Sequence, residues 1–198
     1  MDGSRDVSGF ILAGGKSTRM GADKAFVDLN GRTLLARALD LARLVTPDVC
    51  IVGAGQKFAC FAPVVEDIFR DQGPLGGIHA ALRSSAAELN LMLAVDMPFV
   101  SLAFLQYLIG EAGLATGATV VVPSSDGRRQ PLCAVYRRNF ADAAETALLA
   151  GRNKIDKLFD EVPTRVIDEQ ELDSAGFSNS IFRNLNTIED LEEQQRRA

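Results

Sequence analysis

Short apolar runs alternate with stretches of helical period along the chain. The run from Gly9 to Ala13 predicts a strand, and the apolar positions between Thr33 and Val45 recur every three or four residues, which predicts a helix that stops before Pro47. Because alternating strands and helices are typical of βα units, the pattern predicts the α/β class, with a mainly parallel central sheet between two layers of helices. The run Leu91 to Val95 is apolar throughout, as expected for a central strand covered on both faces.

The same reading predicts the remaining elements. Further strands are expected at Val49 to Val52, Pro63 to Val65, Thr119 to Val122 and Pro131 to Tyr136, and further helices at Ile78 to Ala87, Ser101 to Ala112 and Asn139 to Ala150. Thr187 followed by Asp190 fits a capping box that opens a last, charged helix. No repeat or linker interrupts the chain, so one domain over residues 1–198 is expected.

Composition narrows the class of protein. The net charge of -5 argues against a nucleic-acid-binding surface, which needs an excess of Lys and Arg. The three cysteines form neither a CxxC pair nor a Cys/His cluster, so no zinc site or disulfide framework is indicated. There is no apolar signal core and no apolar run near the ~18 residues that span a bilayer, which predicts a cytoplasmic protein without a membrane segment.

The glycine-rich segment from Leu12 to Lys24 follows the first strand directly. Its spacing fits neither the Walker A loop nor the dinucleotide fingerprint. Glycines at such a turn let backbone N–H groups approach a phosphate or a base edge, and Arg19 and Lys24 would clamp the phosphates. The segment therefore predicts a binding site for a nucleoside triphosphate.

Two carboxylates follow predicted strands. Asp96 ends the buried central strand and Asp67 ends another, so both are expected at the sheet edge where open α/β folds bind ligands. A buried carboxylate favours a bound cation, and Mg²⁺ prefers one or two carboxylates plus substrate phosphates. Asp96 is therefore the predicted metal ligand. The loop after Asp67, with Asp71 and Gly73 to Gly77, is predicted to close over the nucleotide, with Gly76 and Gly77 leaving room for the acceptor. His79 lacks a nucleophile motif nearby and is interpreted as structural.

Four motifs carry a resemblance to a known family. The segment LAGGKSTRMGADKAFVDLNG resembles the nucleotide-binding signature of the molybdenum cofactor guanylyltransferases. The segments GPLGGI at 73–78, VDMPFV at 95–100 and NLNTIEDL at 184–191 resemble the later motifs of that family in order and spacing. The resemblance covers the chain nearly end to end, and it implies a Rossmann-like, glycosyltransferase-A-like nucleotidyltransferase fold.

That family joins GMP from GTP to the phosphate of molybdopterin, with Mg²⁺, and releases pyrophosphate. The resemblance implies that Lys24 contacts the phosphates, Asp67 the nucleotide and Asp96 the metal. It also implies contacts to guanine from Leu12, Ala13, Gly14 and Gly15. Asn184 and Asn186 lie two apart, so in an extended segment they share one face, and the resemblance places them on the acceptor side. Transient contact with proteins that supply or accept the cofactor is a further expectation.

Two departures from the family pattern and three alternatives remain. Gln130 stands before Pro131 where the family often shows His, and Gly53 stands where many members place Asn. The alternatives are a molybdopterin cytidylyltransferase, a sugar-phosphate nucleotidyltransferase and a nucleotide-binding regulator without turnover. Gly14 favours guanine over cytosine, because the resembling cytidylyltransferases tend to carry Ala at this position.

Overall fold

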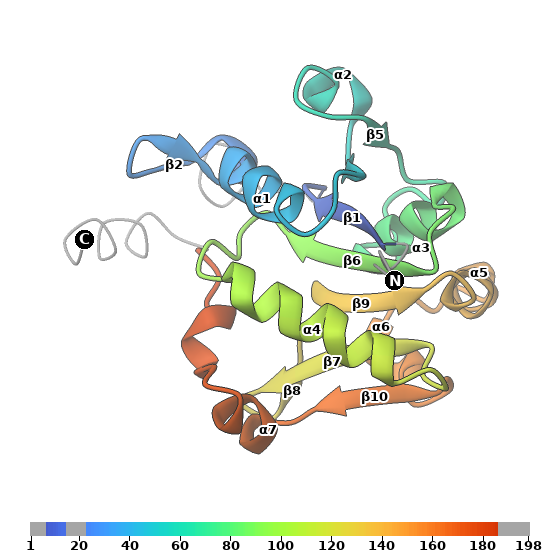
Figure 1. The fold of residues 1–198 in the computed structure, drawn as a ribbon. Coiled ribbons are helices and arrows are strands. Elements are labelled where there is room, and N and C mark those ends of the chain that lie inside the picture. The colour runs from blue at the N-terminus through green and yellow to red at the C-terminus, as the bar shows by residue number, and fades with distance from the viewer. Residues whose placement is uncertain (1–6, 15–22, 186–198) are drawn as a thin grey trace, which may run out of the picture.

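A computed structural model describes residues 7–14 and 23–185 of the chain. Its central sheet has eight strands in the order β10-β7-β9-β6-β1-β4-β5, with β8 paired to β7 (Figure 1). The strands are β1 (Val7–Leu12), β4 (Val49–Val52), β5 (Val64–Val65), β6 (Leu89–Ala94), β7 (Val120–Ser125), β8 (Arg128–Arg129), β9 (Cys133–Arg137) and β10 (Thr164–Ile167), and a separate hairpin joins β2 (Asp28–Leu29) to β3 (Arg32–Thr33). Most pairs are parallel; β9 runs antiparallel between β6 and β7. The predicted mainly parallel sheet is confirmed.

Helices cover both faces of this sheet. They are α1 (Leu34–Arg43), α2 (Gly55–Phe58), α3 (Pro74–Ser84), α4 (Leu102–Leu114), α5 (Phe140–Leu149), α6 (Ile155–Leu158) and α7 (Glu169–Ser174), with 3-10 turns η1 (Lys24–Phe26) and η2 (Asn179–Phe182). One hydrophobic cluster packs α1, α4 and α7 on the first face, and a second packs α3, α5 and α6 on the other. In Figure 1, α4 crosses in front of the strands. Three layers, as predicted, enclose the core.

Local sequence explains where most elements begin. The Thr33 side chain accepts a hydrogen bond from the Ala36 N–H and opens α1, and Ser101 does the same for α4 through the Phe104 N–H. All six residues of β6 are buried, which confirms the predicted central strand. Strand boundaries agree with the predicted ones to within a few residues.

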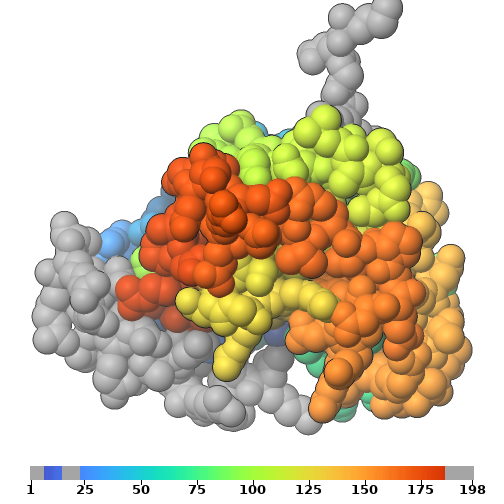
Figure 2. Space-filling view, turned by 90° about the horizontal axis from the view of Figure 1, so that it is seen from below, coloured from blue at the N-terminus to red at the C-terminus, as the bar shows by residue number. Residues whose placement is uncertain are grey.

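The segment between α5 and residue 185 was not predicted to hold any element. It forms α6, β10, α7 and η2, and β10 adds a parallel edge strand beside β7. Asp168 and Glu171 form a capping box at the start of α7. In the view of Figure 2 this segment, orange to red, lies beside the yellow β7–β8 hairpin. The Asp-x-x-Glu spacing is the sequence signal that could have revealed α7.

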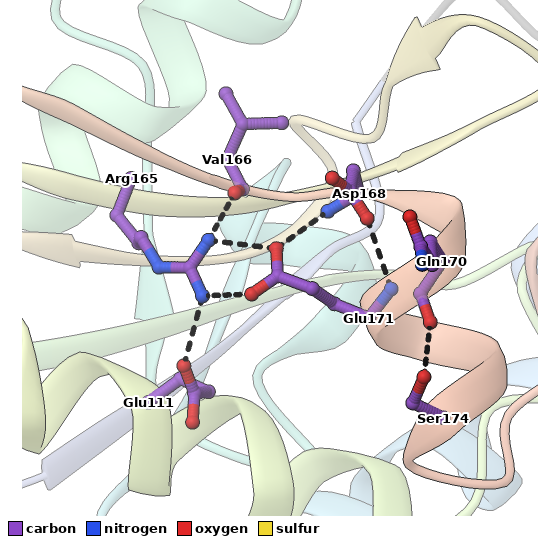
Figure 3. A network of polar contacts seen from close by, with 7 residues as sticks. All are labelled: Glu111, Arg165, Val166, Asp168, Gln170, Glu171 and Ser174. Atoms are coloured by element: carbon purple, nitrogen blue, oxygen red, sulfur yellow. Dashed lines mark hydrogen bonds and ion pairs between the residues drawn. The ribbon is translucent and has the colours of Figure 1, made fainter.

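Arg165 ties this segment to the rest of the fold (Figure 3). Its guanidinium contacts both carboxylate oxygens of Glu171, at 2.5 and 2.9 Å, and Glu111 of α4 at 3.3 Å. The Arg165 partner lowers the pKa of the Glu171 carboxyl. A guanidinium that contacts both oxygens of one carboxylate fixes the relative orientation of the two side chains as well as pairing their charges. The network joins β10, α7 and α4.

The predicted start and end of α3 were wrong. The helix was expected from Ile78 to Ala87, with a loop over residues 73–77; it runs from Pro74 to Ser84. Proline suits the first helical position, because its missing N–H would be unpaired there. Gly73 precedes it with φ of 65°, a conformation that glycine adopts without a steric penalty. The two glycines that follow therefore belong to a buried helical turn.

Candidate functional site

A cavity of about 540 Å³ opens at the carboxyl ends of the parallel strands. Leu12, Val52 and Ala94 are the last residues of β1, β4 and β6, lie side by side in register, and all line it. Seven residues singled out from the sequence also line this cavity, namely Leu12, Ala13, Gly14, Lys24, Asp67, Gly77 and Asp96. These seven residues, from distant parts of the sequence, therefore lie around one cavity.

Lys24 and Asp96 meet across the cavity. The Lys24 Nζ donates a hydrogen bond of 2.9 Å to Asp96 Oδ2, and both side chains are about one-fifth exposed, at 21% and 19%. The two residues were predicted as phosphate clamp and metal ligand, but their pairing was not predicted. The contact brings one cation and one carboxylate together in the lining of the cavity.

Asp96 follows β6 after Val95 and is braced by a distant part of the chain. Its backbone carbonyl accepts a hydrogen bond of 3.1 Å from the N–H of Leu185, a buried residue. Asn184, the neighbour of Leu185, is exposed. Residues 184 and 185, the described start of the predicted acceptor motif, thus lie beside the Asp96 turn, although no described contact links the Asn184 side chain to the cavity.

Asp67 lies against the first turns of α3. A Cβ built on Gly77 would lie 3.4 Å from Asp67 Oδ1 and 3.1 Å from the Val52 side chain, and one on Gly76 would lie 2.7 Å from the carbonyl of Phe69. Both glycines are buried: a side chain at position 76 would clash with the loop carbonyl of Phe69, and one at position 77 would crowd Val52 of β4. Burial raises the pKa of the Asp67 carboxyl. Gly77 lines the cavity, and an acceptor role for either glycine stays a prediction.

Gly14 and Gly53 have different surroundings. A Cβ on Gly14 would meet only the Val52 carbonyl, at 3.9 Å, which is an ordinary contact. A Cβ on Gly53 would lie 2.8 Å from the ring of Phe58, a residue that is 1% exposed. The departure from Asn at position 53 is therefore matched by an aromatic ring that occupies the space of any side chain there.

Several predicted residues lie outside the described ones or away from the cavity. Gly15, Arg19, Asn186 and the helix predicted after Thr187 belong to the first group. His79 is buried in α3, with its ring edge-on to Phe69, and burial is the main cause that lowers its pKa. Its structural interpretation is confirmed. Glu66, beside Asp67, is exposed and accepts a hydrogen bond of 2.8 Å from the Gly55 N–H.

Sequence reasoning missed several of the residues that line the cavity, among them Asp23, Val52 and Leu132. Asp71, in the loop after Asp67 that was expected to close over the nucleotide, lines the cavity as well. Leu132 reaches it because β9 is antiparallel and so begins where β6 ends, a pairing that no local pattern reveals. Asp23 could have been found, because an Asp two residues before a buried Ala is a common cap for a helical turn, as its hydrogen bond from the Ala25 N–H confirms.

Within residues 7–14 and 23–185, no three His, Cys, Asp or Glu side chains gather as metal ligands would. In the same residues, no helix combines the length and apolarity needed to cross a membrane. A cation at this site would consequently depend on one or two carboxylates and on the substrate.

Comparison with known proteins agrees with this geometry. Residues 9–175 match the model of the MobA-like NTP transferase domain. The chain belongs to this family. The chain is therefore a nucleotidyltransferase. The matched segment contains every cavity-lining residue named above.

Individual relatives cover almost the whole chain. A molybdenum cofactor guanylyltransferase from Desulfosudis oleivorans is 36% identical over 192 residues, which are 96% of this chain and 94% of the relative. The solved structure of molybdopterin-guanine dinucleotide biosynthesis protein A from Archaeoglobus fulgidus superposes with a TM-score of 0.81 at 29% identity, over 96% of this chain and 97% of that one. At 14% identity, a 4-diphosphocytidyl-2C-methyl-D-erythritol synthase from Anaerococcus prevotii shares the fold, with a TM-score of 0.71 over 98% of this chain and 96% of that one.

Proposed function

We propose that the chain transfers GMP from GTP to the phosphate of molybdopterin and releases pyrophosphate. The observation that carries the proposal is the pairing of Lys24 with Asp96 in a cavity at the carboxyl ends of β1, β4 and β6. The names of the relatives from Desulfosudis oleivorans and Archaeoglobus fulgidus support guanylyl transfer and the molybdopterin acceptor.

The chemistry is an in-line displacement at the α phosphorus of GTP. An oxygen of the acceptor phosphate forms a new bond to this phosphorus, and the bond from the phosphorus to the oxygen bridging to the β phosphate breaks. Pyrophosphate takes up the electron pair of the broken bond. A phosphate monoester is largely ionised at neutral pH, since its second pKa is about 6, so no general base is required. Catalysis then depends on positioning and on charge.

Lys24 neutralises charge on the departing pyrophosphate in this proposal. Arg19, outside the described residues, has the same proposed role. Because Lys24 Nζ already lies 2.9 Å from Asp96, a triphosphate bound between them would exchange a protein carboxylate for phosphate oxygens as the partner of the ammonium group. The barrier falls because preorganised charge costs little reorganisation during reaction.

The residues present suit a magnesium ion. Asp96, with Asp67 on the same edge, offers hard anionic oxygens, and Mg²⁺ is commonly held by one or two carboxylates together with substrate phosphates. When bound there, the ion would polarise phosphate oxygens and offset the charge that develops during transfer. We assign Asp96 as its ligand and Asp67 as a nucleotide contact.

Guanine selection is assigned to the turn from Leu12 to Gly15. A methyl group at Gly14 would meet only the Val52 carbonyl at 3.9 Å within the protein. The fold itself therefore does not demand glycine, which supports a role for this position in accommodating the base. The reaction is proposed to take place in the cytoplasm, with transient contacts to proteins that supply or accept the cofactor.

The test supplies GTP, CTP, ATP and UTP separately, each with molybdopterin and Mg²⁺, and follows pyrophosphate release. GTP is expected to be the preferred donor. Preference for CTP would refute the guanine assignment, and nucleotide binding without pyrophosphate release would favour the regulator. The Gly14→Ala variant tests the guanine assignment separately, since it should fold normally and lose affinity for GTP.

A further inference from the structure

The described lining of the nucleotide cavity carries more negative than positive side chains. Among the described lining residues there are four carboxylates, on Asp23, Asp67, Asp71 and Asp96, and one ammonium group, on Lys24. A triphosphate is strongly anionic, and like charges at close range oppose its binding. Asp96 and Asp67 have proposed roles with metal and nucleotide. Asp23 has no proposed role with metal or nucleotide, and its carboxylate adds negative charge to the lining.

Asp23 is fixed in place by two contacts. Its Oδ1 accepts a hydrogen bond of 3.0 Å from the Ala25 N–H and so caps η1, the turn that carries Lys24. Its Oδ2 forms an ion pair with Lys57 Nζ. Ala25 is fully buried, so the turn is anchored to the core immediately after Lys24. The orientation of Lys24 thus depends on the Asp23 carboxylate.

Lys57 comes from α2, a short helix that stands away from the sheet at the top of Figure 1. Its Nζ lies 4.7 Å from the ring centroid of Phe58 and 5.5 Å from that of Phe26. Both distances lie within the range of cation–π attraction, about 6 Å. The ammonium group is therefore held between two aromatic rings and one carboxylate.

The helix that carries Lys57 is itself attached to the site. Its first N–H, on Gly55, donates to Glu66, the neighbour of Asp67. Its last residue, Phe58, packs where a side chain at position 53 would lie. Contacts therefore run from the Asp67 edge of the cavity, through α2, to the Lys24 edge.

We propose that Lys57 is a positioning residue for nucleotide binding: it neutralises Asp23 and holds the η1 cap, so that Lys24 is directed into the cavity and the triphosphate meets less negative charge. The inference rests on the proposed function, because it needs a nucleotide in this cavity. It names a residue outside the four motifs that resemble the guanylyltransferases.

The first experiment titrates GTP with Mg²⁺ into the wild type and into Lys57→Met by calorimetry. Methionine keeps an unbranched apolar stem over the rings and removes the charge. The dissociation constant for GTP should rise about five- to tenfold, the size expected for one unscreened charge several ångströms away. The difference should shrink in high salt, because screening acts on partly exposed charges.

The chain offers a matched control in Lys157→Met. Lys157 is the third residue of the four-residue helix α6, as Lys57 is of α2, and it is exposed. Its substitution should leave the dissociation constant unchanged. Lys57→Arg should retain most of the affinity of the wild type, because the charge is kept. In steady-state assays Lys57→Met should raise KM for GTP more than it lowers kcat.

A second substitution separates charge from structure. Asn caps helical turns as well as Asp does, so Asp23→Asn keeps the cap and removes the charge that Lys57 offsets. The double variant Asp23→Asn with Lys57→Met should therefore bind GTP more tightly than Lys57→Met alone. Equal binding by Lys57→Met and the wild type, or no recovery in the double variant, would overturn the inference. Absence of GTP binding by the wild type would instead refute the proposed function.

Discussion

The ion pairs Lys24–Asp96 and Arg165–Glu171 both join a cation to a carboxylate, but they differ in their place in the fold. Lys24 of η1 donates a hydrogen bond to Asp96, which follows β6, and both residues line the cavity. Arg165 of β10 holds Glu171 of α7 through two bonds and Glu111 of α4 through a third (Figure 3). The Lys24–Asp96 pair lines a cavity, where a substrate can reach it, whereas the Arg165 network joins β10, α7 and α4. The place of each contact in the fold, rather than its charge, separates function from stability here.

The largest expected effect follows from removing the carboxylate of the cavity pair. Asp96→Ala should lower kcat/KM for guanylyl transfer about 10³-fold, because it deletes the proposed metal ligand. Its Tm should change little, since the Asp96 side chain contributes one partly exposed ion pair. Thermal unfolding and pyrophosphate release measure the two quantities. Asp173→Asn, an exposed substitution in α7, is the control, and retention of activity by Asp96→Ala would refute the metal assignment.

Removing the cation from the same pair should cost less. Lys24→Met should lower kcat/KM about 10²-fold through lost charge on the leaving pyrophosphate. In the absence of nucleotide it should bind Mn²⁺ more tightly than the wild type, because Asp96 loses its ammonium partner. Calorimetry with Mn²⁺ alone measures this. Weaker metal binding by Lys24→Met would contradict the view that the pair is exchanged for substrate.

The second contact should show the opposite profile. Arg165→Met removes the guanidinium that Glu171 and Glu111 share. It should destabilise the fold by about 1–2 kcal/mol, which lowers Tm by roughly 2–8 °C in a protein of this size. Activity at low temperature should stay near that of the wild type. Arg138→Met, at an exposed arginine, is the comparison. A loss of activity in Arg165→Met without a change in Tm would break the distinction drawn above.

The smallest effect concerns Asp67. Burial raises the pKa of this carboxyl, so the folded state binds its proton more readily than the unfolded state does, and the charged form costs stability above that pKa. Asp67→Asn should therefore have a slightly higher Tm at neutral pH, and its advantage should vanish as acid protonates the wild type. Affinity for GTP should fall about fivefold, through one lost polar contact. A lower Tm at neutral pH would show that the Asp67 charge stabilises the fold.

Much of the fold follows from local pattern. The helix opened by Thr33 and the strand from Leu89 to Ala94 were predicted because apolar spacing and capping chemistry act within a few residues. The strand Thr164–Ile167 was missed because it is short, and its inner face is recognisable only once β7 lies beside it. The start of α3 was missed because Gly76 and Gly77 suggested a loop; Gly76 instead lies against the Phe69 carbonyl, which leaves no room for a side chain, and Gly77 lies close to Val52.

In the candidate site, too, some residues could be predicted from the sequence and others could not. Asp67 and Asp96 could be predicted, since carboxylates at strand ends meet at one sheet edge. Lys57 could not, because α2 is too short to give a periodic pattern, and its contact with Asp23 depends on how two loops fold over each other. The substitution of Asn by Gly53 was visible in the sequence, but its reason, the ring of Phe58, was not.

The hydrogen bond from Leu185 to the Asp96 carbonyl has a consequence for synthesis of the protein. Lys24 is made early, Asp96 near the middle and Leu185 late, so the backbone brace of the site forms only after residue 185 has left the ribosome. A nascent chain can build β1, β4 and β6 before that point, yet it lacks this brace. Chains shortened before residue 185 would then carry Lys24 and Asp96 without the hydrogen bond that braces the Asp96 backbone.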